Sequence, residues 1–390
     1  MMSFKNKLLL TALSLLSLAG CDLLPEDSTQ SYTPSSVTAV VATTSTDYTT
    51  GAISVITGDD NRIAANELLA GNSDRTVNTF NDHFYILDRE TQSTITKFNI
   101  IDSTYPVWQY SSQDALNEAS STNPHQIVFL SETKAYVLRY NRSTIWVVNP
   151  SATTAADFKT GEIDLSAYAD VDGAPEMTMG VIANGKLFVA MQRLEYWSPV
   201  NNAYIAVIDT ATDTEIDTTT SGTALKGIPL TIKNPTTSMQ YLAADDSIYI
   251  QAIGSYTDGE FIGGIEKVDA TTYETSLIID DGTATTHPDE RVSAMAIVSP
   301  TLGYYVSYIS WGSNALYRFD PSTGAETPTT IGTLATGNFS NITVDVNGLI
   351  WLSDVANGNA TVHVIDPQTD TLLDSVATVL NPNKISFINQ

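Results

Sequence analysis

The stretch Ile205-Ala-Val-Ile-Asp209-Thr-Ala-Thr212 is a short apolar strand that ends in an aspartate and a threonine-rich turn. The same phrase returns along the chain, and its closing Asp, Asn or Thr stands at Thr57, Asn99, Asn149, Asp209, Asp269, Asp320 and Asp366. The first two copies are the weakest, and those that close at 149, 209 and 269 are evenly spaced. The chain therefore carries one structural unit in seven copies.

A second strand with alternating apolar and polar residues precedes each copy. Examples are His83-Phe-Tyr-Ile-Leu87, Ala135-Tyr-Val-Leu-Arg139 and Tyr304-Tyr-Val-Ser-Tyr308. A period of two with β-branched and aromatic residues indicates half-buried strands. A unit of several strands that repeats about every 40 to 60 residues is typical of propeller blades. The sequence therefore predicts an all-β fold, a seven-bladed β-propeller over residues 36–390.

The two ends of the chain predict how this ring closes. Asn381-Pro-Asn-Lys-Ile-Ser-Phe387 copies Asn123-Pro-His-Gln-Ile-Val-Phe129, the phrase that opens an internal blade, but no further blade follows it. The first blade, from Val37 to about Leu69, lacks such an opening strand. We therefore expect the C-terminal strand to pair with the N-terminal blade and to latch the ring.

The N-terminal segment has the features of an export signal. Lys5 and Lys7 precede the apolar stretch 8–18, and Leu18-Ala19-Gly20-Cys21 is a lipobox. We expect residues 1–20 to be a lipoprotein signal peptide and Cys21 to carry the lipid, whose acyl chains, palmitate among them, anchor the protein to a membrane. A plain secretory signal is the alternative, and a membrane span would need about 20 apolar residues. Residues 21–35, rich in Ser, Thr, Pro and acidic residues, are expected to form a flexible tether.

Composition restricts the classes of partner. The 390 residues include 44 acidic and 18 basic ones, which gives a formal net charge of −26. Nucleic acid is not expected as a partner, because phosphate binding relies on basic patches. Hydrophobic residues make up 42% of the chain, which suffices for a packed core. Cys21 is the single cysteine, so an intrachain disulfide cannot form.

No familiar catalytic motif occurs in the sequence, which lacks a Gly-x-Ser-x-Gly elbow, a His-Glu-x-x-His pair and a phosphate-binding loop. The four histidines, His83, His125, His287 and His363, are far apart and do not have the spacing of metal ligands. On these grounds the sequence predicts a protein that is not an enzyme and that binds no metal and no cofactor. Catalysis of the kind found in propeller lyases and hydrolases is the less favoured alternative.

Large aromatic and charged residues recur in the loops between the second and third strands of successive blades, which emerge on one face of a propeller. Loops are usually polar, so large aromatic residues there require an explanation. Aromatic and arginine side chains contribute most binding energy at recognition surfaces, although each ring could instead pack on a neighbouring loop. The candidate ligand-binding residues are Tyr48, Arg139, Tyr140, Arg193, Tyr196, Trp197, Tyr256, Tyr308, Trp311 and Asp354.

Strand phrases such as Ala135-Tyr-Val and Val207-Ile-Asp-Thr-Ala-Thr212 resemble the YVTN/YncE-like repeats of seven-bladed propellers. With the lipobox, Asn123-Pro-His-Gln and Asn184-Gly-Lys-Leu-Phe-Val189 are similar to phrases of surface lipoproteins that capture nutrients, vitamin B12 included, for TonB-dependent outer-membrane transporters.

This resemblance implies a lipid-anchored protein of the cell envelope, on the outer membrane or cell surface of a Gram-negative bacterium. It implies capture of a small or medium-sized ligand, with cobalamin or another corrinoid as the sharpest candidate. The alternative is an interaction scaffold that binds another envelope protein and no small molecule. The sequence contains nothing that indicates oligomers, so a monomer is expected.

Overall fold

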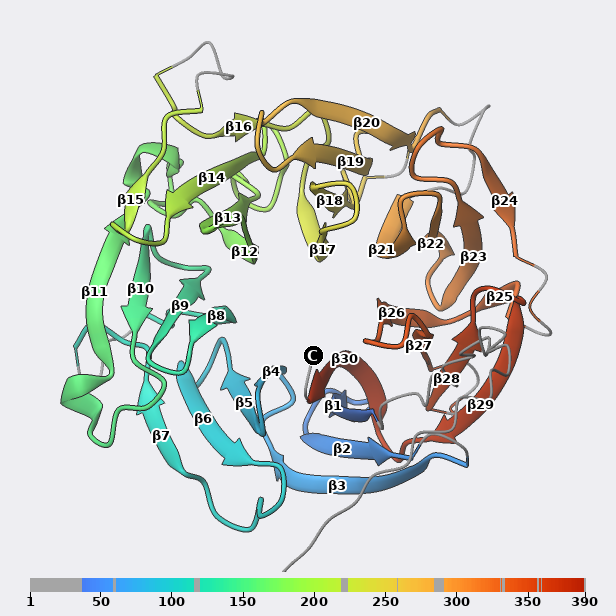
Figure 1. The fold of residues 1–390 in the computed structure, drawn as a ribbon, viewed down its shortest axis with the longest axis horizontal. Helices are drawn as coiled ribbons and strands as arrows, with labels where there is room; N and C mark the ends of the chain where they lie inside the picture. The colour runs from blue at the N-terminus through green and yellow to red at the C-terminus, as the bar shows by residue number, and fades with distance from the viewer. Residues whose placement is uncertain are drawn as a thin grey trace, which may run out of the picture. The chain divides into compact units, whose positions relative to one another are not determined.

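Seven β-sheets follow one another around a ring in the computed structural model (Figure 1). The structure describes residues 37–390 apart from 59–60, 116–119, 219–223, 258, 284–290, 330, 332–333, 356–357, 359 and 389–390. Cys21, the signal segment and the tether lie outside the described residues, as does His287. Within the described part of the chain, no helix is long and apolar enough to cross a membrane. The predicted seven-bladed β-propeller is confirmed.

Each sheet is an antiparallel blade that runs from the centre of the ring to its rim. The innermost strands are β30 (Asn381–Ile388), β4 (Arg75–Phe80), β8 (Pro124–Ser131), β12 (Met177–Ala183), β17 (Pro235–Leu242), β21 (Arg291–Ser299) and β26 (Phe339–Val344). The second strands are β1 (Thr38–Thr44), β5 (His83–Asp88), β9 (Lys134–Arg139), β13 (Lys186–Met191), β18 (Ser247–Ala252), β22 (Leu302–Ser310) and β27 (Ile350–Asp354).

The outer half of each blade is built in the same order. The third strands are β2 (Gly51–Thr57), β6 (Thr94–Asn99), β10 (Thr144–Val148), β14 (Tyr204–Asp209), β19 (Gly264–Asp269), β23 (Ser313–Phe319) and β28 (Thr361–Asp366). The rim strands are β3 (Ile63–Gly71), β7 (Trp108–Ser111), β11 (Lys159–Asp164), β15 (Thr214–Glu215), β16 (Ile228–Pro229), β20 (Thr275–Asp280), β24 (Glu326–Pro328), β25 (Thr336–Gly337) and β29 (Thr371–Ala377). Two short 3-10 helices, η1 (Ala155–Asp157) and η2 (Ser166–Tyr168), flank β11.

A side-chain turn explains the Asp or Asn that closes the repeated phrase. The Oδ1 atom of Asp209 accepts a hydrogen bond from the backbone N–H of Ala211 at 2.8 Å, and Asp269 accepts one from Thr271 at 2.9 Å. The equivalent bond is made by Asn99, Asn149, Asp320 and Asp366. Short side chains of this type satisfy the backbone of a tight turn. The motif therefore marks the point where the third strand of a blade turns toward the rim.

β30 closes the ring as predicted. It is the innermost strand of the first blade and pairs antiparallel with β1, from Thr38 opposite Ile388 to Thr44 opposite Asn381. Phe387 of β30 also packs in one buried cluster with Trp351 of the last blade. The last strand of the chain thus completes the first blade and joins it to the last.

The hydrophobic core lies between neighbouring blades. One cluster, for example, joins Tyr136 and Val147 of one sheet to Leu187 and Val189 of the next. Because packing occurs between sheets, the ring leaves two sets of loops for other purposes. We call one set, the connections from second to third strands, the loop face; its segments are 45–50, 89–93, 140–143, 192–203, 253–263, 311–312 and 355–360.

Candidate ligand-binding site

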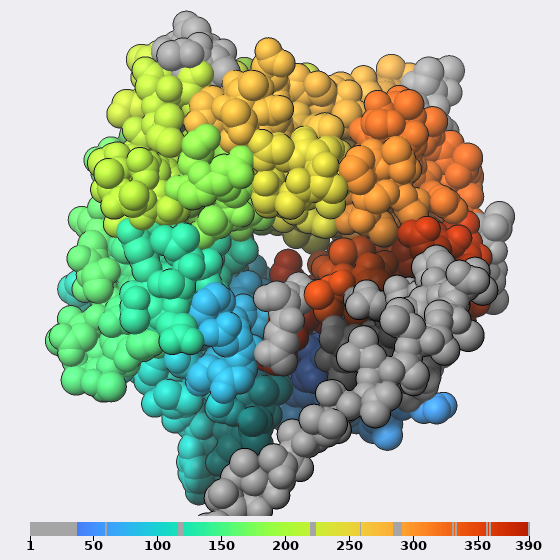
Figure 2. All heavy atoms as spheres, in the orientation of Figure 1, coloured from blue at the N-terminus to red at the C-terminus, as the bar shows by residue number. Residues whose placement is uncertain are grey.

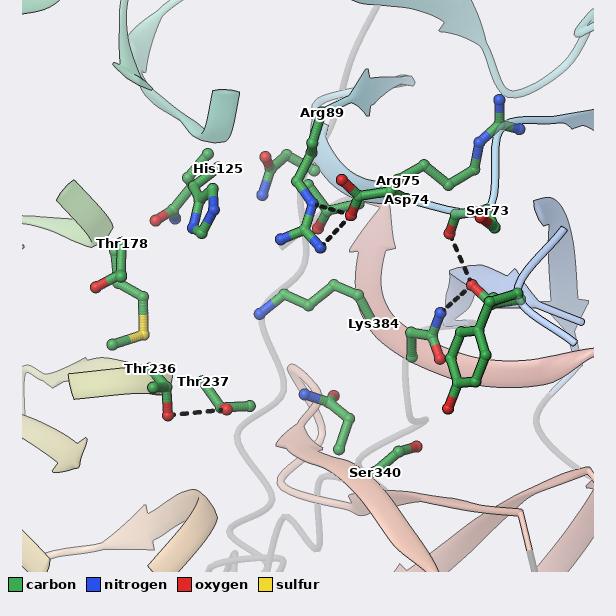
Figure 3. A pocket seen from close by; sticks show the side chains of 18 residues that line it. Ser73, Asp74, Arg75, Arg89, His125, Thr178, Thr236, Thr237, Ser340 and Lys384 are labelled. Atoms are coloured by element: carbon green, nitrogen blue, oxygen red, sulfur yellow. Dashed lines mark hydrogen bonds and ion pairs between the residues drawn. The ribbon is translucent and has the colours of Figure 1, made fainter. Parts of the chain in front are cut away.

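A cavity of about 550 Å³, here called the central cavity, occupies the channel at the loop face (Figure 3). Its wall is made by residues near the start of six innermost strands, by Tyr48 and Arg89 of the loop face, and by Thr44, Ser73 and Asp74. Most of the wall is hydroxyl or amide side chains, such as Thr178, Thr236 and Ser340. Figure 2 shows the opening at the centre of the ring. The central cavity is therefore a polar chamber that can be reached from outside.

Two ion pairs stabilise one side of the central cavity. Arg89 Nε donates to Asp74 Oδ1 at 2.8 Å, and Arg75 Nη2 donates to Asp88 Oδ1 at 2.7 Å. Arg75 and Asp88 are both buried. A buried charge without its partner would be costly, so each arginine is held by its own carboxylate. These two cations are already neutralised within the wall.

His125 adds a neutral imidazole to the central cavity. Its ring stacks on Tyr140 with centroids 4.4 Å apart. Burial and the neighbouring Arg89 guanidinium hold the pKa of His125 well below its usual range. A neutral imidazole has one donor and one acceptor nitrogen. His125 can therefore form hydrogen bonds with a polar ligand without adding a charge.

Three predicted residues, Tyr48, Tyr308 and Trp311, line a second cavity of about 430 Å³, here called the first aromatic pocket. Tyr48, Thr44, Ser340 and Asn383 line both this pocket and the central cavity, so the two spaces are continuous. Trp311 and Tyr48 are 86% and 67% exposed. The sequence-based prediction thus named side chains that the fold brings together from blades far apart in the chain.

Another predicted group, Tyr140, Tyr196 and Trp197, lines a cavity of about 260 Å³, here called the second aromatic pocket. Tyr196 and Trp197 form the tip of a tight turn and are 77% and 76% exposed. Both have left-handed backbone angles, with φ of 50° and 69°, and so does Tyr48 with 57°. Aromatic residues rarely adopt this region, and such strain concentrates at functional sites.

Glu176 lies at the base of the second aromatic pocket and is buried. Its Oε2 atom accepts a hydrogen bond from the backbone N–H of Leu194 at 2.9 Å. Burial, with the nearby Asp172 carboxylate, raises the pKa of Glu176 to about 8. The side chain therefore keeps its proton at neutral pH and can donate a hydrogen bond.

The other four predicted residues lie outside these pockets. Arg139 is 1% exposed, and its Nη1 atom pairs with Asp114 Oδ2 at 2.8 Å while its guanidinium covers Trp146. It cannot serve as a ligand contact on the loop face, because the strand end directs it into the core. The prediction that Arg139 contacts a ligand is therefore corrected, and we assign it a structural role.

Arg193, Asp354 and Tyr256 differ in their surroundings. Arg193 Nε donates to the carbonyl oxygen of Tyr168 at 2.9 Å, which holds its loop in place. Asp354 Oδ1 accepts from the backbone N–H of Asn338 at 3.2 Å, beside the first aromatic pocket. Tyr256 is exposed on the loop face, outside the three cavities.

Lys384 lines the central cavity and is the residue that the sequence-based site prediction missed. A signal for it exists in the repeat. In the phrases Asn123-Pro-His-Gln126 and Asn381-Pro-Asn-Lys384, Gln126 and Lys384 hold the same position, and both line the central cavity. Once one copy of the blade-opening phrase is known to face the channel, the equivalent residues of the other copies can be predicted to face it as well.

Comparison with known proteins identifies the fold. No family model and no curated protein matches the chain. A putative 6-phosphogluconolactonase from Bacteroides fragilis is similar in structure, with 13% identity, a TM-score of 0.61 and coverage of 92% of this chain and 99% of that one. A protein from Lactobacillus plantarum gives 14%, 0.58, 91% and 100%, and a streptogramin B lyase gives 14%, 0.51, 80% and 89%. At such identities the likeness shows the seven-bladed fold alone.

The comparison also corrects the prediction that the protein is not an enzyme. That prediction depended on the absence of familiar catalytic motifs, yet propellers similar in fold to this chain carry the names of a lactonase and a lyase. Missing motifs therefore do not exclude catalysis in this architecture. The fold by itself does not show an activity either, because one fold supports many unrelated sites.

Proposed function

We propose that this protein is an envelope lipoprotein that captures a small or medium-sized ligand on its loop face. The observation that carries the proposal is the continuity of the first aromatic pocket with the central cavity. Exposed aromatic rings line one part of this concave site and polar groups line the other, so the site offers a ligand both apolar contacts and hydrogen bonds. The lipobox that ends at Cys21 supports anchoring to a membrane.

A corrinoid such as cobalamin is the sharpest ligand candidate. It is supported by the resemblance of the repeat phrases and lipobox to capture lipoproteins, and by aromatic rings that suit a large, partly flat molecule. Tyr308 and Trp311 would lie against the flat part of such a ligand, and the hydroxyl and amide groups of the cavity would bind its polar side groups. The protein would then pass the ligand to a TonB-dependent transporter in the outer membrane.

Calorimetric titration of the full chain with cobalamin, cobinamide and a small glycan panel tests this proposal. We expect one ligand to bind tightly and to raise the melting temperature, because binding to the native state alone stabilises it. Tyr308→Ala/Trp311→Ala should weaken that binding at least about tenfold, the loss expected for central aromatic contacts. The melting temperature without ligand should fall only modestly, since Trp311 is exposed and Tyr308 is half-buried.

Two further variants locate the site. Tyr105→Ala removes an exposed tyrosine from the connection between β6 and β7 and should leave affinity unchanged. Tyr196→Ala/Trp197→Ala empties the second aromatic pocket, and a loss confined to that variant would move the site there. No response to the whole panel, with one stoichiometric protein that co-purifies, would replace the proposal by the interaction scaffold.

A further inference from the structure

The central cavity contains a lysine whose charge has no counterpart in the part of the chain that the structure describes. Lys384 extends from β30 into the cavity, and Arg89, His125 and Thr236 lie around it (Figure 3). Among the described residues, the structure shows no ion pair and no hydrogen bond for its ammonium group. The other two cations of the wall, Arg75 and Arg89, are paired with carboxylates.

The acidic groups near Lys384 are engaged elsewhere. Asp74 lies on the same cavity wall and accepts from Arg89. Asp345 lines the adjoining stretch of the channel, where its Oδ2 atom accepts from Trp351 Nε1 at 2.8 Å and its Oδ1 atom accepts from the backbone N–H of Leu349 at 2.9 Å. The lysine thus provides an excess positive charge inside a chain whose net charge is −26.

A second feature of the same wall points to a hydrogen-bond donor on the ligand, next to its anionic group, because an amide oxygen accepts hydrogen bonds. Asn341 is 2% exposed and lines the central cavity, and its Oδ1 atom has no hydrogen-bond partner among the described residues. Buried polar atoms are nearly always hydrogen-bonded in native proteins, so such an exception requires an explanation. Lys384 and Asn341 both line the further stretch of channel as well.

We propose that Lys384 binds an anionic group of the ligand, a carboxylate or a phosphate, inside the central cavity. The inference rests on the proposed function and specifies that the captured ligand carries a negative charge. The aromatic part of the site lies at Tyr48, Tyr308 and Trp311, and the anionic group enters the channel next to it. A cation in a confined, partly desolvated space attracts an anion more strongly than one at an open surface.

The pKa of Lys384 reflects burial without a compensating charge. Burial lowers the pKa of its ammonium group, because the cavity wall replaces only part of the water around the charge. A bound anion would restore favourable interactions to the charged form. The cavity wall also supplies Thr236, Thr237 and neutral His125 as hydrogen-bond donors around that anion.

Titration of the full chain with inorganic phosphate and with acetate tests the proposal, with sodium chloride at matched ionic strength as reference. We expect saturable binding of at least one of the two anions at millimolar concentration. Lys384→Met and Lys384→Gln should each weaken it at least tenfold. Lys226→Met removes the same charge from an exposed position, 3.9 Å from Glu215, and should bind as the native chain does.

The outcomes separate this inference from the proposed function. Tyr308→Ala/Trp311→Ala should keep the affinity for the bare anion, since a small anion at Lys384 does not reach those rings, while it loses the organic ligand. A preference for phosphate or for acetate shows which of the two anions the cavity favours. Native protein that binds neither anion, or anion binding that survives both Lys384 variants, would overturn the proposal.

Discussion

At the residue scale, the local environment decides what each side chain of the loop face can do. Trp311 and Arg139 were equally good candidates by residue type, but one is exposed at a turn and the other is buried at a strand end. Glu176 and Lys384 are both ionisable and both face a cavity. Burial raises the pKa of Glu176 and lowers the pKa of Lys384, so it favours the neutral form of each. Residue type therefore identifies candidates, and burial and partners determine their roles.

The raised pKa of Glu176 predicts a pH dependence of stability. The folded-state pKa is about 8 against an ordinary 4.5, so the folded protein holds a proton that the unfolded chain releases. The contribution of Glu176 to the free energy of unfolding is full below pH 4.5 and declines as pH rises to about 8. Glu176→Gln imitates the protonated form, so we expect it to be near neutral at low pH and stabilising by roughly 2–4 kcal/mol at pH 8.5.

Urea unfolding of native and variant protein across this pH range measures the effect. Glu274→Gln, a change at an exposed glutamate, should show no such trend. A constant difference between native protein and Glu176→Gln at all pH values would show that the pKa of Glu176 is the same in the folded and the unfolded protein.

Arg139 provides a test of its structural role. Arg139→Met leaves Asp114 without its closest cation and removes the hydrogen bonds to Ser112 and Thr144. We expect the free energy of unfolding to fall by roughly 1–3 kcal/mol, because the hydrogen bonds of the buried guanidinium are lost, while the exposed Asp114 keeps Arg142 and Lys159 nearby. Arg139→Lys should recover part of the lost free energy of unfolding. Ligand affinity, measured by calorimetry well below the melting temperature, should change little, and a selective loss of affinity would return Arg139 to the site.

At the element scale, β30 performs three tasks. It completes the first blade by pairing with β1, it packs against the last blade through Phe387, and it carries Lys384 into the channel. One strand thus links closure of the ring to the chemistry of the site. The first aromatic pocket, whose loops come from the first, sixth and last blades, also includes this strand, since Asn381 and Asn383 line that pocket.

Deletion of residues 381–390 should lower the melting temperature sharply. The change removes β30, uncovers the edge of β1 and opens the hydrophobic cluster around Trp351. We expect a drop of at least about 10 °C, because the deletion costs several kcal/mol and each kcal/mol lowers the melting temperature by a few degrees. The exposed edge of β1 should also promote aggregation. Differential scanning calorimetry measures the drop. A control that ends at Ile388 keeps β30 whole and should melt as the native chain does, whereas an unchanged melting curve for the longer deletion would contradict this topology.

At the scale of the whole molecule, the ring separates stability from recognition. The core lies between neighbouring blades, so the loop face and the channel are free to hold residues that do not contribute to packing. The channel holds a cation, Lys384, for which the described residues provide no partner, although the net charge of the chain is −26. The same separation explains why structures of similar fold carry the names of a lactonase and a lyase.

The sequence by itself determined the strands, the number of blades, the closure by the C-terminal strand and the loops that form the loop face. These features repeat, and a repeat can be read from residues close together in the chain, as in the Asx turns after Asp209 and Asp269. Only the tertiary structure decided which candidates share a site. Ring closure brings Tyr48 beside Tyr308 and Trp311, and it places Lys384 in the channel with His125. Such neighbours come from distant blades, and periodicity along the chain carries no information about distances across the ring.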